Sequence, residues 1–390
     1  MHLPITQPSF AGSALKCLTR VSTLLLMSVG LSPAASPTPE ITVAAYYYPC
    51  EHPDPRWDKA KYPGFPEWDL VRKAKPRFPG HKQPKVPLWG YTDESDPAVM
   101  AQKIEAAANY GVNAFIFDWY WYDDKPYLDR ALDEAFLKAK NRRKIKFALM
   151  WANHDWHDIM PAEQGKEPPL IFHGAVDRKI FDHATDVIVK RYFSQPNYWK
   201  VGGKPYFSIY ELWTLVKGLG GLEQTREALD AFRAKAKAAG LPGIHLNAVG
   251  WGELSNEMVE ALGIDSVTSY SWIHHVGLPH DSTYADWAQK SVALWPGMRE
   301  HWKVPYLPNV SIGWDNTPRF AWATRVTDRD PAAFQQALAA AKAFVAEGKG
   351  PNVVTINSWT EWTEGSYLEP DTVFHSAFLG AIRSVFGGKE

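Results

Sequence analysis

Two glutamates three positions apart, Glu361 and Glu364, stand near the end of the chain in the segment TINSWTEWTEG. The segment begins as an apolar strand and then places the two carboxyl groups among tryptophans. A carboxyl pair can cleave a glycosidic bond, with one group as general acid and the other as nucleophile or base. Residues three apart on an extended strand point to opposite faces, so the pair converges only if the chain turns, which Gly365 permits. The alternative is two surface glutamates in an ordinary loop.

The elements that would position this pair alternate along the chain. Short apolar segments predict strands at residues 41–49, 113–121, 145–153, 205–212, 244–251, 266–272, 306–315 and 352–359. Helical stretches lie between them, and two of these, 96–111 and 330–348, open with Asp-Pro and end at glycine, as helices often do. Eight strands alternating with helices predict an α/β fold, a (β/α)8 TIM barrel in a single domain. Residues 50–95 interrupt the alternation, and we expect them to form a long ordered loop over the barrel mouth after the first strand.

The carboxyl ends of the strands carry the active site in this fold. Nearly every predicted strand end has an aromatic residue, and most also have a polar group. Aromatic rings can stack on the apolar faces of sugars, while carboxylates, amides and hydroxyls bind sugar hydroxyls, although any single ring could equally be core packing. The substrate-binding residues predicted at these ends are Tyr48, Asp118, Trp119, Asn153, Asp155, Tyr210, Trp251, Trp272, Trp314, Asp315, Asn357 and Trp359.

The composition agrees with a carbohydrate ligand. The 390 residues have a formal net charge of -1, which argues against nucleic acid or an anionic membrane as the main partner. The chain contains 18 Trp, 17 Tyr and 18 Phe, more rings than a core alone requires, and this favours stacking surfaces. We expect an oligosaccharide or polysaccharide as the partner and a monomeric protein.

The N-terminus has the pattern of a signal peptide. Lys16 and Arg20 precede the apolar run VSTLLLMSVGL and the small residues SPAAS. The run is too short to span a membrane, although a retained anchor is the alternative. We expect residues 1–35 to be removed and residues 36–390 to form the catalytic domain of an exported, periplasmic or secreted bacterial protein. Cys17 would leave with the peptide and Cys50 would remain alone, so no intrachain disulfide could form.

Several motifs resemble those of the WbsX-like proteins, relatives of glycoside hydrolase family 99. They are FPEW, KAKPRFPGHKQPKVPL, YGVNAFIFDWYWY, MWANHDW, GWDNTPR and NSWTEWTEGSYLEPD, and together they span most of the mature chain. The last is the most specific, because it is similar to the family's Asn-x-Trp-x-Glu-Trp-x-Glu-Gly run. The resemblance implies a (β/α)8 barrel that acts on glycans without a metal or another cofactor. It also adds Glu67, in FPEW, to the substrate-binding residues.

The same resemblance implies roles for the glutamate pair. Hydrolases of family 99 use the two glutamates of this motif together with the substrate's own 2-hydroxyl. One glutamate deprotonates that hydroxyl to give a 1,2-anhydro sugar, and the other protonates the leaving oxygen and later activates water, with net retention. We assign Glu361, nearer the strand, as the base and Glu364 as the acid. The family suggests an α-mannoside-like substrate, but Thr363 stands where its hydrolases typically have histidine, which affects the expected sugar more than the reaction.

Other interpretations remain open. A glycosyltransferase of the WbsX type, acting in polysaccharide biosynthesis, is one, although the apparent signal peptide and the lack of a nucleotide-cradling loop weigh against it. A non-catalytic carbohydrate-binding barrel is another, and it would require the two carboxyl groups to lie too far apart. A metal site at HDWHD (154–158), a nucleophilic Cys50 and a phosphate loop at KGLGG (217–221) are less favoured.

Overall fold

The computed structural model describes residues 40–278, 282–324 and 326–387. The predicted signal peptide, residues 1–35, lies outside the described residues. Within the described ranges, no helix combines the length and the apolar character that crossing a membrane requires.

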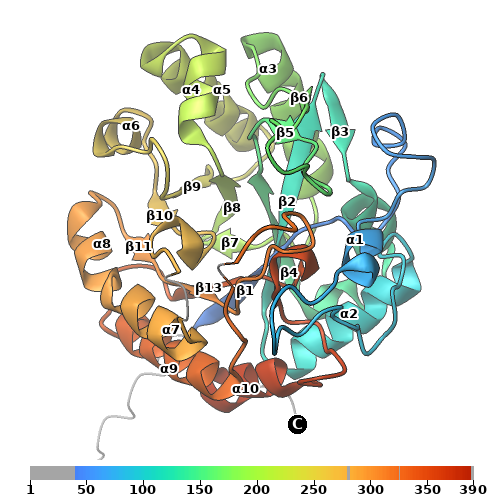
Figure 1. Ribbon diagram of the computed structural model, residues 1–390. Helices are drawn as coiled ribbons and strands as arrows, with labels where there is room; N and C mark the ends of the chain where they lie inside the picture. The colour runs from blue at the N-terminus through green and yellow to red at the C-terminus, as the bar shows by residue number, and fades with distance from the viewer. Residues whose placement is uncertain (1–39, 279–281, 325, 388–390) are drawn as a thin grey trace, which may run out of the picture. The chain divides into compact units, whose positions relative to one another are not determined.

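A ring of parallel strands forms the centre of the fold (Figure 1). The strands follow the order β11-β10-β9-β8-β4-β2-β1-β13-β12. Their bounds are β1 Thr42–Tyr47, β2 Ala114–Tyr122, β4 Lys146–Trp151, β8 Lys204–Ile209, β9 His245–Val249, β10 Ser266–Thr268, β11 Tyr306–Leu307, β12 Asn309–Ser311 and β13 Val353–Asn357. β11 pairs with β10, and β12 pairs with β13. Pro308, which lies between β11 and β12, has no N–H to donate to a neighbouring strand. The two short strands therefore share the seventh position, and the predicted (β/α)8 barrel is confirmed.

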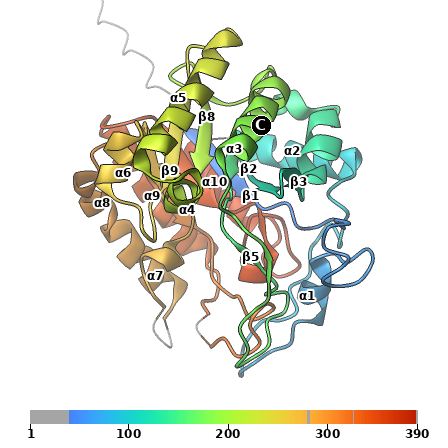
Figure 2. The same ribbon diagram turned by 90° about the horizontal axis from the view of Figure 1, so that it is seen from above.

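Helices surround the ring (Figures 1 and 2). Their bounds are α1 Trp68–Lys73, α2 Pro97–Asn109, α3 Arg178–Val187, α4 Leu212–Leu219, α5 Leu222–Ala238, α6 Asn256–Ala261, α7 Tyr284–Ala293, α8 Trp295–His301, α9 Pro331–Ala346 and α10 Ala377–Phe386. The two Asp-Pro starts behave as predicted, since the carboxylates of Asp96 and Asp330 accept hydrogen bonds from the first turns of α2 and α9. Gly111 and Gly348 follow these helices with φ of 87° and 70°, left-handed values that suit glycine.

The loop between β1 and α2 is ordered, as predicted, and carries α1. It packs against the segment after β4: the rings of Trp57 and Trp156 lie 5.3 Å apart, and Lys61 forms an ion pair with Asp158. Figure 2 shows α1 and β5 on the same side of the barrel. Short antiparallel pairings complete the mouth, formed by β3 Lys125–Tyr127 with β2, β5 Trp156–His157 with β6 Leu170–Phe172, and β14 Thr360–Glu361 with β15 Ser366–Tyr367. β7 Lys200–Val201 pairs with the first residues of β8, at the opposite end of the barrel.

Polar side chains inside the barrel bond to one another across the strands. The Ser208 hydroxyl donates to Asn247 at 2.8 Å, and the Asn309 amide donates to the Thr355 hydroxyl at 3.1 Å. Buried polar groups are stable only when such partners exist. These bonds therefore tie β8 to β9 and β12 to β13 inside the barrel.

Candidate active site

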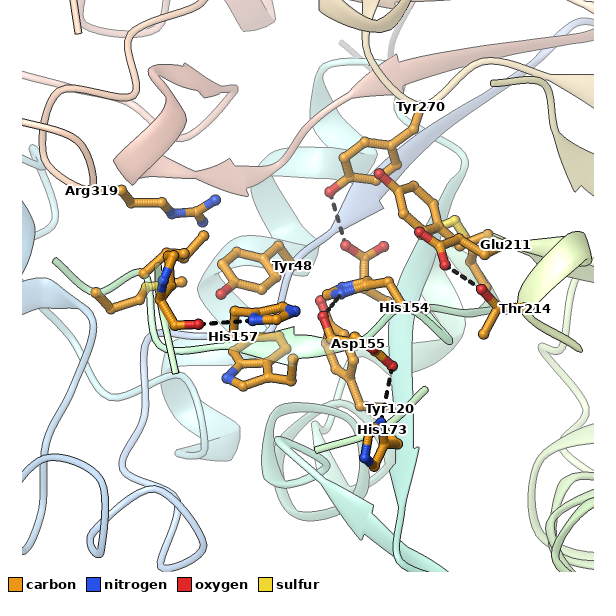
Figure 3. A pocket seen from close by; sticks show the side chains of 18 of the residues that line it. Tyr48, Tyr120, His154, Asp155, His157, His173, Glu211, Thr214, Tyr270 and Arg319 are labelled. Carbon is orange, nitrogen blue, oxygen red and sulfur yellow. Dashed lines mark hydrogen bonds and ion pairs between the residues drawn. The ribbon is translucent and has the colours of Figure 1, made fainter. Parts of the chain in front are cut away.

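A cavity of about 1050 Å³ opens among the segments that follow the barrel strands (Figure 3). Its volume lies at the upper end of the range for ligand sites. It gathers side chains from the ends of β1, β2, β4, β8 and β9 and from the segment after β13. The predicted site residues that line it are Tyr48, Asp118, Asp155, Tyr210, Trp251, Glu361 and Glu364.

The segment after β13 turns as its sequence suggested. Glu361 ends β14, and a short 3-10 turn, Trp362–Glu364, leads to Gly365, which has a left-handed φ of 67°. A Cβ on Gly365 would also approach the Cβ of Asp315 to 2.9 Å, so both conformation and space favour glycine here. The turn brings Glu361 and Glu364 to the same cavity.

Arg319 joins the two glutamates. Its Nη1 donates to Oε1 of Glu364 at 2.6 Å, and its Nη2 donates to Oε2 of Glu361 at 3.1 Å. Nη2 also contacts Oε1 of Glu67 at 3.1 Å. Because both glutamates touch one guanidinium, their carboxyl groups lie close together, below the upper limit of roughly 10 Å for glycosidase pairs. Arg319 is 6% exposed, and the surrounding carboxylates raise its pKa above the usual value, so it stays charged.

Tyr270 links Glu361 to a third carboxyl group. Its hydroxyl lies 2.8 Å from Oε1 of Glu361 and 2.9 Å from Oδ2 of Asp118. A hydroxyl has one proton, so it can donate to only one of these groups, and the other must itself carry a proton to complete the second bond. Asp118 is 4% exposed, its Oδ1 has no partner within the described part of the chain, and burial raises its pKa well above the ordinary value. Glu361 has Arg319 as a second donor, so the geometry favours the proton on Asp118.

Burial sets the acid–base character of the glutamate pair. It raises the pKa of Glu361 well above the usual value, the charge of Glu364 raises it further, and Arg319 opposes both effects. Burial likewise raises the pKa of Glu364, again against the effect of Arg319. Two nearby carboxyl groups with raised pKa values can hold one proton between them near neutral pH, which is what general acid–base catalysis requires.

Aromatic rings and imidazoles also line the cavity (Figure 3). Tyr48, Tyr120 and Tyr210 line the cavity, and the ring of Tyr210 lies 5.0 Å from that of Trp251. Nδ1 of His154 lies 2.8 Å from a backbone carbonyl, which can only accept, so this nitrogen carries the proton. Burial lowers the pKa of His154, so the ring is neutral and its Nε2 is an acceptor for a ligand hydroxyl. Tyr120, His154, Tyr270 and Arg319 were not among the predicted site residues.

Four predicted tryptophans do not line the cavity. Trp119 stacks on Trp121 at 5.2 Å, on the face of β2 opposite Asp118, because successive strand residues alternate. Trp359 packs 4.9 Å from Phe115 in the core.

The other two are Trp272 and Trp314. Trp272 donates its indole N–H to the carbonyl of Asn309 at 2.8 Å. Trp314 is half-buried where its backbone pairs with that of Thr327.

Four predicted polar residues also lie behind the wall. Asn153 exchanges two hydrogen bonds with the backbone of Glu211, at 2.8 and 2.9 Å, and so ties the end of β4 to that of β8. Asp315 accepts a hydrogen bond from the Gln83 amide at 2.7 Å and also pairs with Lys85 and His81 of the β1–α2 loop. These two partners hold the pKa of Asp315 well below the usual range. Glu67 supports Arg319, and the amide of Asn357 is buried without a hydrogen-bond partner among the described residues.

Another buried carboxylate, Glu369, holds the two tryptophans of the segment TINSWTEWTEG. The indole N–H groups of Trp359 and Trp362 donate to the two oxygens of Glu369, at 3.1 and 3.0 Å. Nζ of Lys103 lies 2.8 Å from Glu369 and 2.5 Å from Glu51, and all of these side chains are buried. The rings on either side of Glu361 therefore anchor the backbone to a buried ion cluster and do not face the cavity.

Replacing Lys103 with methionine should destabilise the protein strongly. Glu51 and Glu369 would lose their buried cation, and breaking such a pair from one side typically costs about 3–5 kcal/mol. We expect a lower urea midpoint in equilibrium unfolding followed by tryptophan fluorescence. The matched control is Lys237→Met at the exposed end of α5, which should change stability by less than about 1 kcal/mol. Equal midpoints for the two variants would show that the cluster contributes nothing.

Comparison with known proteins gives a sequence family. The sequence model of the family described as "Glycosyltransferase WbsX" matches residues 43–382. The protein WxcX, named as uncharacterized, is 28% identical over 367 residues in two strains of Xanthomonas campestris pv. campestris. The match covers 88% of this chain and 49% of WxcX, so the chain spans about half the length of the curated relatives it matches.

Solved structures share the fold. The GH99 endo-alpha-mannosidase from Bacteroides thetaiotaomicron, in complex with Bis-Tris-propane, superposes with a TM-score of 0.58 at 15% identity, over 88% of this chain and 95% of that chain. A second structure of that enzyme gives 0.57 at 16% identity, over 88% and 96%. A glycoside hydrolase-like protein gives 0.56 at 14% identity, over 90% and 97%. At these identities the likeness concerns the barrel and its connections.

Proposed function

The chain belongs to the WbsX glycosyltransferase family, and from that premise we propose that it is a retaining glycoside hydrolase acting on an oligosaccharide or polysaccharide. Membership in this family, whose description names a glycosyltransferase, supports an enzyme that acts on carbohydrates. The observation that carries the proposal is the pair Glu361 and Glu364, which line one cavity and share the guanidinium of Arg319. A binding barrel without catalysis would not need two buried carboxyl groups with raised pKa values on one guanidinium.

We assign Glu361 as the base and Glu364 as the acid. Glu361 takes the proton of the substrate's 2-hydroxyl, and the 2-oxygen attacks C1 as the bond from C1 to the leaving oxygen breaks. Glu364 gives its proton to that oxygen. It then takes a proton from water, whose oxygen opens the 1,2-anhydro ring at C1, and Glu361 returns a proton to the 2-oxygen. Two displacements at C1 give net retention.

The neighbouring groups favour these roles. Tyr270 donates to Glu361 and so stabilises its ionised form, while Asp118 keeps its own proton and donates it to the Tyr270 oxygen. Arg319 donates to both glutamates and does not distinguish them. Tyr48, Tyr210 and Trp251 offer faces for sugar rings, and Asp118 and Asp155 offer acceptors for hydroxyls. An α-mannoside is the first substrate to test, because its 2-oxygen and leaving group lie on opposite faces of the ring. We expect activity without a metal or cofactor, in an exported monomer.

A glycosyltransferase is the second candidate, because the family's description names that activity. The two reactions are separated by supplying purified protein with a panel of polysaccharides in water and, in parallel, with nucleotide sugars and acceptor glycans. Chromatography and mass spectrometry of the products decide the outcome. Released oligosaccharides with retained anomeric configuration support the hydrolase. Consumption of a nucleotide sugar, with no cleavage of any polysaccharide, would overturn it.

A further inference from the structure

A second cavity, of about 470 Å³, adjoins the first. It lies between the segments that follow β9 and β10 and helix α8. Trp251 lines both cavities, so the two share one residue of their walls. The volume is within the range of small-ligand sites.

Trp251 is held firmly between the cavities. Its ring stacks on His274, with centroids 4.6 Å apart and planes 20° apart, and its indole N–H donates to the carbonyl of Tyr210 at 3.2 Å. The glycine before it, Gly250, leaves room for a further ring, because a Cβ there would approach Trp302 to 3.3 Å. The indoles of Trp251 and Trp302 both border the second cavity. One face of Trp251 is covered by His274, so Trp302 is the indole that we assign to the apolar face of a sugar ring in this cavity.

Imidazoles supply its hydrogen-bonding groups. His274, His275 and His301 line the cavity. Burial lowers the pKa of His274 to about 4 and also lowers that of His275, so both rings are neutral near pH 7. A neutral imidazole has one donor and one acceptor nitrogen. Nε2 of His275 already bonds the Ser269 hydroxyl at 2.9 Å, which leaves this ring one nitrogen for a ligand. Aromatic faces with neutral hydrogen-bonding groups match an uncharged sugar better than a uronic acid or a phosphate.

We propose that the second cavity is a further subsite that binds a neutral pyranose unit of the glycan whose scissile bond lies in the first cavity. This rests on the proposed function, because the occupant is part of the same substrate. The shared wall at Trp251 is the reason for assigning both cavities to one ligand. The protein should therefore bind longer oligosaccharides more tightly than short ones.

The test measures binding separately from hydrolysis. Calorimetry with α-linked manno-oligosaccharides of two to six units, at a temperature where no product forms during the titration, gives Kd against chain length. The wild type should show a gain of about tenfold once the chain reaches the second cavity. Trp302→Ala should remove that gain and leave the Kd of the shortest member unchanged.

A second variant, which fills the cavity, keeps the test decisive if Trp302→Ala does not fold. Gly297 lines the second cavity within α8, and a Cβ there would meet no atom within 4 Å. Gly297→Leu should therefore fold, because leucine favours helix over glycine, and it should abolish the chain-length gain. The matched control is Gly380→Leu in α10, where a Cβ also has open space.

The outcomes separate this inference from the hydrolase proposal. A chain-length gain that is lost in Gly297→Leu and kept in Gly380→Leu supports the subsite, even if no oligosaccharide is cleaved, which would count against hydrolysis alone. Equal chain-length dependence in all variants, or none in the wild type, overturns the subsite whether or not cleavage occurs.

Discussion

Glu361→Gln is expected to lower kcat/KM by about 10²–10⁴-fold, both for a natural glycan and for glycosides with activated leaving groups such as aryl or fluoride. The 2-hydroxyl must be deprotonated in either case, and glutamine cannot accept its proton. Glu364→Ala should lower the rate on natural glycans by a similar factor but spare the activated substrates, whose leaving groups need no proton. Steady-state kinetics of both variants on both substrate types is the measurement.

The controls define what each result means. Glu227→Gln, on the exposed face of α5, should keep wild-type kinetics. A 2-deoxy substrate analogue should be inert even with the wild type, and its turnover at a normal rate would leave a direct glutamate nucleophile in place of the anhydro sugar. If Glu361→Gln kept its rate on activated substrates and Glu364→Ala did not, Glu364 would be the base and Glu361 the acid. Full activity of Glu361→Gln would remove this residue from the mechanism.

The barrel could be predicted because its signals are local. Strand and helix periodicity, the Asp-Pro caps at Asp96 and Asp330 and the glycine stops depend on neighbouring residues only. The turn at Gly365 was predictable for the same reason. The split of the seventh strand at Pro308 also follows from local chemistry, although the sequence pattern suggested one continuous strand.

The surroundings of the glutamates could not be predicted, because they depend on contacts between distant residues. Arg319 meets Glu361 across 42 positions and Glu67 across 252, and Tyr270 meets Asp118 across 152. Nothing in the spacing of these residues indicates that one guanidinium would serve three carboxylates.

Aromatic residues were assigned to the site too freely. Trp119 and Asp118 are neighbours on β2, so alternation allows only one of them to face the cavity, and the carboxylate does. Trp359 was predicted to bind substrate, but its indole N–H serves Glu369 inside the fold. Rings near a strand end indicate sugar binding only when strand alternation or a turn places them on the cavity side.

Arg319→Met is expected to move the pH profile of kcat/KM to higher pH as well as to lower its maximum. Arg319 lowers the pKa of both Glu361 and Glu364, so its removal should raise both. The acidic limb reports the group that must be ionised and the alkaline limb the group that must be protonated. Raising both pKa values moves both limbs upward. Kinetics from acidic to alkaline pH, with folding checked by circular dichroism at each value, is the measurement.

Arg319→Lys separates the effect of the positive charge at this position from the effect of the planar guanidinium geometry. An ammonium keeps the positive charge among Glu67, Glu361 and Glu364, but it cannot reach them with the planar geometry of a guanidinium. The lysine variant should therefore retain the wild-type position of both limbs while losing rate, whereas the methionine variant should shift them and lose about 3–5 kcal/mol of stability because three buried carboxylates lack a cation. An unshifted profile in Arg319→Met would mean that another group sets the proton affinity of the pair. The positive charge of Arg319 sets the pH at which the glutamates exchange protons, and the planar guanidinium determines how closely their carboxyl groups are held.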